Sequence, residues 1–429
     1  MQHEEHIESY YAATLNDPSV HLPLEGESRA DVCVIGGGLT GISAALNLAE
    51  RGYKVILLEA NRIAWGASGR NGGQVCTGYS CGMEKIEKWA GREGAKRFWD
   101  LAEESKGIVR ERVEKHRIDC DLTWGYYMAA CKPGHLKELN ESCENWIGHY
   151  GYDAEFKWAA TPEQSRAFVD SPDYVGGVWE SGAGHLHPLN YALGLARAAK
   201  EAGAEIHEAS PVQRIEQGRQ AVVHTPQGQV TAGAVLVCCN AYLGRLVPQL
   251  TGIVMPIANY IGATPPLDEA TARRLLPGND AVSNSRFIVN YYRLSPDRRL
   301  LFGGLASYSL IDPPNLRQAL QRDMQRTFPQ LGDVPFDRVW GGRVGISMNR
   351  SPHVGRLGSN LYFAQGYSGQ GVALTGLMGR VLAEAVAGEQ ERLDLFAKLP
   401  HSHFPGGLVL RTPVLALAMA WFRIKDALG

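Results

Sequence analysis

Apolar and polar positions divide the first part of the chain into a strand, a helix and a second strand. Residues 31–37 (DVCVIGG) form a short apolar run, which is typical of a buried strand in a parallel sheet. Apolar residues then recur at helical spacing from Ile42 to Ala49, and Gly52 follows in the position that commonly ends a helix. Residues 54–60 (KVILLEA) form a second apolar run. This order predicts a βαβ unit with two parallel strands.

The remaining patterns predict further helices and strands. A long charged helical pattern spans residues 84–115, and extended runs occupy residues 286–295 and 299–304. Residues 223–242 predict a hairpin that leads into a strand of the first sheet. Residues 361–388 predict a strand, a glycine-rich turn and a helix with one apolar face. The chain is therefore expected to combine α/β and α+β parts.

Composition excludes few classes of globular protein but narrows the partners. The chain has 429 residues, of which 45% are hydrophobic and 21% charged, and its formal net charge is -2. This length suffices for two interleaved domains. No long basic run occurs, so we expect no nucleic-acid partner. None of the 8 cysteines forms a CxxC pair or a zinc-type spacing, which predicts reduced thiols, a cytoplasmic location and no bound metal.

An apolar stretch lies close to the C-terminus, at residues 412–422. It is too short to span a bilayer. We expect it to dock as a helix on the protein, with contact to a membrane surface as the less favoured alternative.

The βαβ unit carries the spacing GxGxxG at Gly36, Gly38 and Gly41. The first glycine permits a tight turn, the second lets a pyrophosphate approach the backbone, and the third lets helix and strand pack closely. The N-terminus of the helix offers unpaired N–H groups to phosphates. Glu59 ends the second strand, where a carboxylate can accept the ribose hydroxyl groups of an adenosine. A glycine-rich turn without a ligand is the alternative, but the complete order favours a dinucleotide other than NADP.

A second glycine-rich loop, GASGRNGGQ at residues 66–74, follows Glu59 closely. It holds no apolar residue larger than Ala67, so it does not pack a core. Its backbone N–H groups and short polar side chains suit an extended ligand that leads away from the adenosine. No second GxGxxG follows a strand later in the chain. We therefore predict FAD rather than NAD, with the ribityl chain and the isoalloxazine ring beyond this loop.

A third glycine-rich segment, GYSGQGV at residues 366–372, precedes the C-terminal helix. Gly366, Gly369 and Gly371 allow a ligand to approach the backbone closely. A helix N-terminus directed at the N1–C2=O edge of a flavin would stabilise the reduced ring. The alternative is a buried helix with a flexible entry loop.

These motifs, in this order, resemble the D-amino-acid oxidase-like FAD-dependent amine oxidoreductases. The resemblance covers most of the chain from about residue 9, and it rests on ADVCVIGGGLTGISAALNLAE, RIAWGASGRNGGQ, GAGHLHPLN, CNAYLG, YYRLSPDRRLLFGG, GYSGQGVALT and LPHSHFPGG. Within that family, the motifs are similar to those of the gamma-glutamylputrescine and gamma-glutamylpolyamine oxidases of bacterial polyamine catabolism.

The resemblance implies a Rossmann-like FAD-binding domain and an interleaved substrate domain built on a large mixed or antiparallel sheet. We expect the FAD-binding domain at residues 1–80, 175–250 and 340–400, and the substrate domain at residues 81–174 and 251–339. Residues 401–429 are expected to form a C-terminal docking tail.

The resemblance also implies which residues contact FAD. The backbone of Val212 is expected to contact the adenine, with a plain core strand residue as the alternative. The full expected set is Gly36, Gly38, Leu39, Thr40, Gly41, Glu59, Ala60, Arg62, Gly66, Ala67, Ser68, Arg70, Asn71, Gly72, Gly73, Gln74, Val212, Asn240, Gly366, Ser368, Gly369, Gln370, Gly371 and Val372. Neither His nor Cys occurs in residues 66–74 or 340–347, so we expect non-covalent FAD.

The reaction that the resemblance implies moves a hydride from the carbon that bears an amine to flavin N5. The resulting imine then hydrolyses to an aldehyde and ammonia. No catalytic acid–base residue is expected, because the cofactor carries the difficult step and a dry pocket favours the neutral amine. Dioxygen is the expected electron acceptor, with hydrogen peroxide as the product.

Aromatic residues are expected to shape the amine pocket, with ordinary core packing as the alternative. The candidates are Tyr260, Tyr291, Tyr292 and Trp340, together with Arg293 and Arg343. The resemblance also reveals a departure from the family pattern. Relatives that oxidise amino acids hold the substrate α-carboxylate with an arginine in a pattern like W-x-G-x-R. Here Arg343 comes one position early, and Val344 stands in the expected position.

This departure argues against a carboxylate clamp at the reacting carbon and fits a gamma-glutamyl polyamine, whose carboxylate is distant. Arg286 or Arg293 is a candidate for that distant end, with surface salt bridges as the alternative. His185 and His187 are expected to serve in a turn or helix cap rather than as metal ligands.

Two other functions stay open at this point. One is a membrane-coupled FAD dehydrogenase of a secondary amine or D-amino acid that passes electrons to a quinone. The other is a non-catalytic flavoprotein whose second domain binds a partner. The peroxide yield per aldehyde separates the first from an oxidase, and flavin bleaching by an amine excludes the second.

Overall fold

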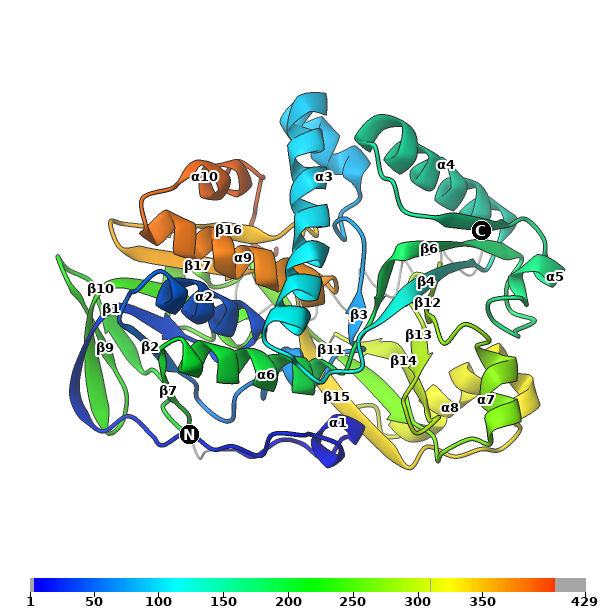
Figure 1. The fold of residues 1–429 in the computed structure, drawn as a ribbon, viewed down its shortest axis with the longest axis horizontal. Helices are drawn as coiled ribbons and strands as arrows, with labels where there is room; N and C mark the ends of the chain where they lie inside the picture. The colour runs from blue at the N-terminus through cyan, green and yellow to red at the C-terminus, as the bar shows by residue number, and fades with distance from the viewer. Residues whose placement is uncertain (1–3, 309, 406–429) are drawn as a thin grey trace.

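The computed structural model describes residues 4–308 and 310–405 of the chain. They form two sheets that lie side by side, with the long helix α3 (Met83–Lys115) standing between the two halves (Figure 1). Gly91 interrupts the helical backbone of α3 near its N-terminal end.

The first sheet contains the predicted βαβ unit. Its strand order is β16 (His353–Leu357), β17 (Leu361–Gln365), β10 (Gly228–Val237), β1 (Gly26–Ile35), β2 (Val55–Leu58) and β7 (Glu205–His207). These strands pair in parallel except β16, and the short strands β8 (Arg214–Glu216) and β9 (Ala221–His224) extend β10 as an antiparallel ribbon. The predicted hairpin at residues 223–242 is therefore confirmed.

Helices α2 (Leu39–Glu50), α9 (Gly371–Val386) and α10 (Glu391–Ala397) pack against strands of this sheet, and α6 (Pro188–Glu201) packs beside α2. The helix α2 packs against both α6 and α9. Small residues permit the close crossing of α2 and α9, since a Cβ atom at Gly379 would lie 2.3 Å from Oγ of Ser43. The hydroxyl group of Ser43 donates to the carbonyl oxygen of Gly376 at 2.8 Å. This crossing fixes the N-terminal ends of both helices relative to each other.

The second sheet is larger and mixed. Its strand order is β15 (Arg338–Ser347), β11 (Val254–Ala263), β14 (Leu300–Ser307), β13 (Tyr291–Leu294), β12 (Ala281–Asn284), β4 (Thr123–Ala130), β6 (Gly176–His185) and β3 (Gln74–Val75), and β5 (Phe156–Ala159) also pairs with β6. Only β4 and β12 pair in parallel among these described strands. The accompanying helices are α4 (Pro133–Tyr150), α5 (Pro162–Ser165), α7 (Glu269–Leu275) and α8 (Leu316–Thr327). The predicted fold class is confirmed.

The predicted domain boundaries need three corrections. Strands β3, β6 and β15 belong to the second sheet, although we expected residues 1–80, 175–250 and 340–400 in the FAD-binding domain. The predicted end at residue 80 therefore comes too late. The predicted starts at residues 175 and 340 therefore come too early. Strand patterns reveal which residues face a core, but they do not reveal which distant strand completes the pairing.

The N-terminal segment is partly buried, and the C-terminal segment is described as far as residue 405. The first helix, α1 (Tyr10–Ala13), buries Tyr10 and Tyr11, so the N-terminal segment packs into the molecule more deeply than its polar sequence suggests. Helix α10 (Glu391–Ala397) precedes Phe404, which packs against Met255 and Ile257. The apolar stretch at residues 412–422 and most of the predicted docking tail lie outside the described residues.

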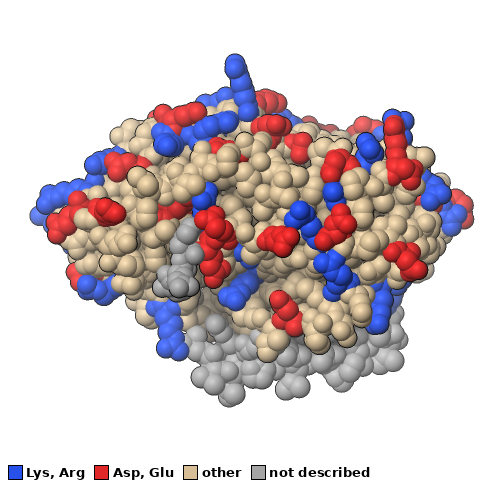
Figure 2. Space-filling view, turned by 90° about the horizontal axis from the view of Figure 1, so that it is seen from below, with Lys and Arg blue, Asp and Glu red and all other residues tan. Residues whose placement is uncertain are grey.

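None of the described helices alone is long and apolar enough to span a membrane. Helices α9 and α10 meet the length and composition criterion only as a pair, and this pair is bent by 120°. On the face shown in Figure 2, acidic and basic side chains are interspersed.

Candidate active site

A cavity of about 1140 Å³ lies where the first sheet meets the second. Its walls come from the N-terminal turns of α2 and α9, the loop at residues 66–74 and strands β11, β13 and β15. Its volume exceeds the roughly 300–1,000 Å³ of most small-molecule pockets. The cavity is therefore large enough for an extended cofactor and a second, smaller molecule.

The glycine-rich turn after β1 forms one end of the cavity. Gly36 has a φ of +107°, and a Cβ atom there would lie 2.9 Å from the carbonyl oxygen of Cys238. Gly41 touches Gly36 inside the turn, where a Cβ atom would lie 1.9 Å from the Gly36 carbonyl oxygen. The turn therefore brings the N-terminus of α2 to the cavity, with Leu39 and Thr40 on its wall. Such an N-terminus is a suitable place for phosphate groups.

Glu59 is fixed by the backbone on both of its oxygen atoms. Oε2 accepts from the N–H of Gly37 at 2.7 Å, and Oε1 accepts from the N–H of Asn61 at 2.9 Å. Burial raises the pKa of this carboxyl group, and the backbone hydrogen bonds oppose that rise. Because each carboxylate oxygen can accept more than one hydrogen bond, Glu59 can also accept from a ligand in the cavity that it lines.

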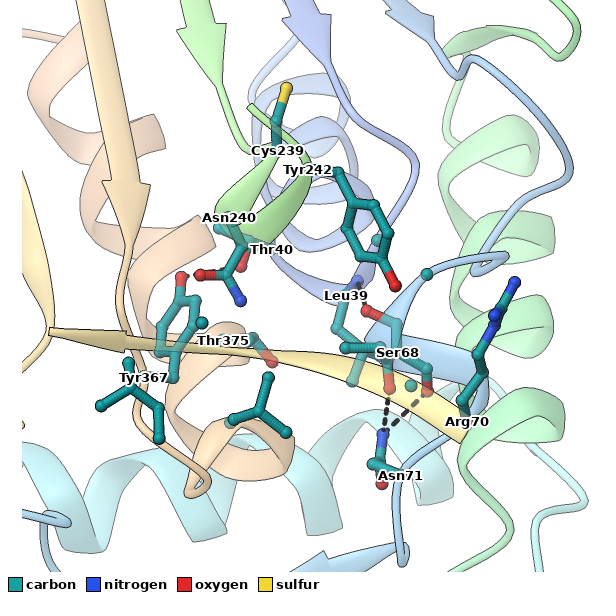
Figure 3. Close-up of a pocket in the computed structure, with 18 of the residues that line it drawn as sticks. Leu39, Thr40, Ser68, Arg70, Asn71, Cys239, Asn240, Tyr242, Tyr367 and Thr375 are labelled. Carbon is teal, nitrogen blue, oxygen red and sulfur yellow. Dashed lines mark hydrogen bonds between the residues drawn. The ribbon is translucent and has the colours of Figure 1, made fainter. Parts of the chain in front are cut away.

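The loop at residues 66–74 is held by its own side chains. Nδ2 of Asn71 donates to the carbonyl oxygens of Ala67 and Ser68, both at 2.9 Å, and Oδ1 accepts from the N–H of Gly73 (Figure 3). The hydroxyl group of Ser68 accepts from the N–H of Leu39 at 2.9 Å, which ties the loop to the first turn of α2. The loop is therefore shaped before any ligand binds.

Arg70 offers an unused donor at this loop. Its Nε donates to the carbonyl oxygen of Trp65 at 2.6 Å, and its guanidinium lies 4.1 Å from the Trp65 ring centroid. Its Nη2 atom is buried, and no described residue accepts from it. The guanidinium group points away from the other labelled cavity residues, so Arg70 borders the cavity with the rest of the residue (Figure 3).

The N-terminal turn of α9 forms another wall of the cavity. Tyr367 links it to α2, because its hydroxyl group hydrogen-bonds Oγ1 of Thr40 at 2.7 Å (Figure 3). Oδ1 of Asn240 accepts from the N–H of Gly366 at 3.0 Å. Gly369 has a φ of +100° and leads into α9, and a Cβ atom there would meet open space. Two helix N-termini thus lie on one cavity.

Most residues in the predicted cofactor set line this cavity. They are Gly36, Gly38, Leu39, Thr40, Glu59, Ala60, Gly66, Ala67, Ser68, Arg70, Asn71, Gly72, Gln74, Val212, Asn240, Ser368, Gly369, Gln370, Gly371 and Val372. Gly41, Gly73 and Gly366 lie behind the wall and shape its turns. Arg62 is a correction, since its side chain pairs with Glu208 at 3.3 Å and donates to the carbonyl oxygen of Ser19.

Strand alternation corrects two of the predicted pocket tyrosines. Tyr291 does line the cavity, and its hydroxyl group donates to Oδ1 of Asn259 at 2.5 Å. Tyr292 is next to it on β13 and lies in the core of the second domain. Tyr260 follows Asn259 on β11 and donates to Asp312 on the other side of the sheet. Successive side chains of a strand point to opposite faces, so these neighbours do not share the pocket.

The same rule separates two residues of β15. Val344 lines the cavity, whereas Arg343 is exposed with its guanidinium 5.9 Å from the ring of Tyr242. Trp340 does not line the cavity either, and its Nε1 donates to the carbonyl oxygen of Arg70 at 3.0 Å. Arg343 and Trp340 are thus removed from the predicted pocket.

Arg286 and Arg293 were predicted as candidates for the distant end of the substrate, but both make structural contacts and neither lines the cavity. Arg293 is 1% exposed and donates to the carbonyl oxygens of Gly72 at 3.0 Å and Leu186 at 2.9 Å. Arg286 forms an ion pair with Asp173 at 2.5 Å. Neither lines the cavity, so neither is placed to hold a distant carboxylate group within it.

Several cavity residues were missed by the sequence analysis, namely Trp65, Cys76, Tyr126, Tyr242, Ile257, Asn259, Ile261, Ser283, Phe287, Ile346, Arg350 and Tyr367. Three of them could have been found from their spacing, because Ile257, Asn259 and Ile261 occupy every second position of strand β11 and therefore share one face. Trp65 directly precedes the loop at residues 66–74, and Tyr367 lies within the glycine-rich segment at residues 366–372. His187 caps α6, as expected, by accepting from the N–H of Asn190 at 3.1 Å.

Comparison with known proteins identifies the class. The chain matches the DAO family model, described as FAD dependent oxidoreductase, over residues 31–385. The chain therefore belongs to this family of FAD-dependent oxidoreductases, and the predicted resemblance is confirmed.

Individual relatives are similar over nearly their full length. Gamma-glutamylputrescine oxidoreductase of Escherichia coli (strain K12) is 42% identical over 426 residues, which cover 99% of each chain. Probable oxidoreductase OrdL of Haemophilus influenzae is 38% identical over 429 residues, which cover 99% of this chain and 98% of the relative. Glycine oxidase from Geobacillus kaustophilus shares the fold, with a TM-score of 0.73 and 22% identity over 87% of this chain and 100% of that chain.

The cavity fits the FAD of this family in its donor and acceptor groups. Two helix N-termini offer N–H donors to phosphate and carbonyl oxygens. Close contacts inside the turn require glycine at positions 36 and 38, since a Cβ atom at Gly38 would lie 2.9 Å from Oγ of Ser68, whereas a Cβ atom at Gly369 would meet open space. Glu59 offers acceptors for hydroxyl groups.

Proposed function

We propose that the chain holds FAD non-covalently in this cavity and oxidises the terminal amine of a gamma-glutamylated amine such as gamma-glutamylputrescine. The 42% identity to gamma-glutamylputrescine oxidoreductase supports the substrate class. The observation that carries the proposal is the apolar side chain of Val344 on the cavity wall, at the strand position where an arginine would hold an α-carboxylate.

The proposed cofactor contacts follow the cavity from end to end. Glu59 holds the ribose of the adenosine, the first turn of α2 holds the pyrophosphate, and the loop at residues 66–74 and the first turn of α9 hold the flavin half. Bound FAD supplies the acceptor for the hydride that leaves the amine-bearing carbon.

The substrate side of the cavity selects a neutral aliphatic amine. Ile257, Val344 and Ile346 give it apolar walls, and the amide of Asn259 is already occupied by Tyr291 and by the carbonyl oxygen of Leu305 at 2.7 Å. An apolar wall disfavours an ammonium ion, so the amine enters or becomes neutral before its C–H bond breaks. Orientation of that bond and exclusion of water are the contributions of the protein.

The proposed reaction balances with dioxygen as the oxidant. One amine, one dioxygen and one water give one aldehyde, one ammonia and one hydrogen peroxide. A quinone in place of dioxygen is the alternative, and it would give no peroxide. Counting peroxide per aldehyde decides between them.

Non-covalent binding is supported by the state of the cysteines at the cavity. Burial raises the pKa of Cys76 to about 11 and that of Cys239 to about 12. Both thiols therefore stay protonated at neutral pH and are poor nucleophiles towards a flavin.

Removing the Glu59 carboxylate is expected to weaken FAD binding. Charged hydrogen bonds contribute about 1.5–3 kcal/mol each, so Glu59→Ala should raise the FAD dissociation constant by about tenfold to a hundredfold. Glu59→Gln should fall between wild type and Glu59→Ala, because the amide keeps one acceptor. Fluorescence quenching during titration of apoprotein with FAD measures this constant. Glu25→Ala, at an exposed position, is the control, and an unchanged constant in Glu59→Ala would remove Glu59 from the cofactor site.

A substrate screen tests the proposed function. Specificity constants for gamma-glutamylputrescine, putrescine, longer polyamines, sarcosine and D-alanine should be greatest for gamma-glutamylputrescine, with one peroxide per aldehyde. Val344→Arg should lower that value by at least about tenfold, since it places an unpaired guanidinium on an apolar wall. Arg343→Leu alters the adjacent side chain on the opposite face and should stay within about twofold. A screen in which D-alanine is fastest would overturn the proposal.

A further inference from the structure

A smaller chamber of about 160 Å³ adjoins the main cavity. The two spaces share four wall residues, Cys76, Tyr126, Ser283 and Gln370. Gln370 is the N-cap residue of α9, so the chamber opens beside the end of the cavity proposed for the flavin. At about 30 Å³ for each water-sized group, the chamber holds a few such groups and no complete polyamine.

A buried carboxylate forms one wall of the chamber. Glu180 on β6 is 1% exposed. Its Oε2 accepts from the hydroxyl group of Thr77 at 3.0 Å and from the hydroxyl group of Tyr152. Lys106 donates to both of these hydroxyl groups at 2.8 Å and pairs with Glu103 at 2.9 Å. The network contains one cation, Lys106, and two carboxyl groups, Glu103 and Glu180. When both carboxyl groups are ionised, the network carries one negative charge in excess.

Glu180 and Gln370 each have an acceptor atom that no described residue uses, and the exposed carboxyl group of Glu84 also borders the chamber. Oε1 of Glu180 accepts no hydrogen bond from the described residues, although Oε2 of the same group accepts two. Oε1 of Gln370 is buried, and no described residue donates to it. Buried polar atoms in proteins are normally paired, so Oε1 of Gln370 indicates a donor that the chain does not supply, and Oε1 of Glu180 is a second acceptor from a residue that lines the same chamber. Burial raises the pKa of Glu180, so a cation bound beside it would favour the charged form of this carboxyl group.

From this geometry we propose that the chamber is a binding site for a primary ammonium group, held by Oε1 of Glu180 and Oε1 of Gln370. An ammonium group has several donors, one positive charge and a size that the chamber accepts. It offsets the excess anion of the network and pairs both free acceptors. Two sources share this chemistry, namely the amino end of the substrate before oxidation and the ammonia released after it. The inference rests on the proposed function only for these two sources.

Ammonium titration of the holoenzyme tests the chamber directly. Ammonium chloride should change the flavin absorption spectrum and the melting temperature in a saturable way, while tetramethylammonium chloride at equal ionic strength should not, because it has no N–H donor. Glu180→Gln should raise the apparent ammonium dissociation constant by at least about tenfold, through loss of a charged hydrogen bond. Its amide oxygen can still accept from Thr77 and Tyr152, which preserves the network.

Two further variants separate the chamber from its surroundings. Glu103→Gln removes the same charge from the same lysine but does not border the chamber, so its ammonium constant should stay within about threefold of wild type. Ser142→Leu places a larger side chain into the chamber from the half-buried position of Ser142 on α4, and it should abolish the response without touching Glu180. No saturable response in wild type, or wild-type binding in both Glu180→Gln and Ser142→Leu, would overturn the proposal.

Kinetics distinguish the two sources of the ammonium group. Ammonium that competes with the amine substrate assigns the chamber to the amino end of the substrate. Ammonium that inhibits without competing assigns it to released ammonia. If gamma-glutamylputrescine proves not to be a substrate while the titration still depends on Glu180, the proposed function falls and the ammonium site stands. If the amine is oxidised and the titration shows no saturable response, the proposed function stands and the ammonium site falls.

Discussion

Replacing Gly41 with alanine is expected to leave the purified protein without bound flavin. The added Cβ atom would lie 1.9 Å from the carbonyl oxygen of Gly36, a distance that no pair of non-bonded atoms tolerates. Backbone must therefore move at the turn that presents α2 to the cofactor. Overpacking of this kind costs about 1–3 kcal/mol or more, and at the upper end the FAD dissociation constant would rise by at least about a hundredfold.

Flavin content after acid precipitation measures this effect. Wild-type protein should release its yellow colour into the supernatant, whereas the Gly41→Ala sample should contain almost none. The matched control is Gly107→Ala on α3, where a Cβ atom meets no other atom within 4 Å, and it should keep full flavin and gain up to about 1 kcal/mol of helix stability. Full flavin in Gly41→Ala would contradict the role of this turn, and a yellow pellet in wild type would contradict non-covalent binding.

Replacing Arg293 with methionine is expected to destabilise the fold by about 3–5 kcal/mol and to loosen the cofactor loop. The Arg293 guanidinium is buried and joins three segments, since it donates to Gly72 in the loop, to Leu186 before α6 and to the hydroxyl group of Tyr11 at 3.4 Å. Methionine fills much of the space but leaves these acceptors without donors. Each buried unpaired group costs about 1–3 kcal/mol, so three acceptors in the lower part of this range account for the expected loss of about 3–5 kcal/mol.

Urea unfolding of holoenzyme and apoprotein, followed by circular dichroism, measures the loss. Arg293→Lys keeps the charge without the planar fork and should lie between methionine and wild type. Arg273→Met removes an exposed arginine that pairs with Glu269 and should change stability by less than about 1 kcal/mol. If Arg293→Met unfolds at the same urea concentration as wild type, the loop does not depend on this arginine.

The nucleotide turn could be predicted from sequence because its determinants are local. Gly36, Gly38, Gly41 and Glu59 lie within one βαβ unit. A Cβ atom at any of the three glycines would come too close to a backbone or side-chain atom of the protein. The loop at residues 66–74 was predictable for the same reason, since Asn71 bonds to its own loop.

The substrate pocket was harder because its walls depend on which face of a strand meets the cavity. The sequence analysis placed Tyr291 and Tyr292 in one pocket, although successive side chains in a strand point to opposite faces. The same alternation separates Arg343 from Val344. Applying it to β11, β13 and β15 would have excluded Tyr260, Tyr292 and Arg343 once a single cavity residue on each strand was known.

Other features depend on contacts that the sequence pattern does not encode. Arg293 looked like a candidate for substrate binding, yet its partners come from segments more than a hundred positions away in the chain. The membership of β6 and β15 in the second sheet is likewise a matter of long-range pairing. The hydrogen bond between Tyr367 and Thr40 joins residues 327 positions apart in the chain.

The most direct test is anaerobic mixing of the purified holoenzyme with gamma-glutamylputrescine while the visible flavin absorption is followed. We expect the yellow colour to bleach within a single turnover, much faster than with D-alanine, and to return when air is admitted. Flavin that stays oxidised in the presence of the amine, or that D-alanine bleaches faster, would contradict the assignment of this cavity to a gamma-glutamylated amine.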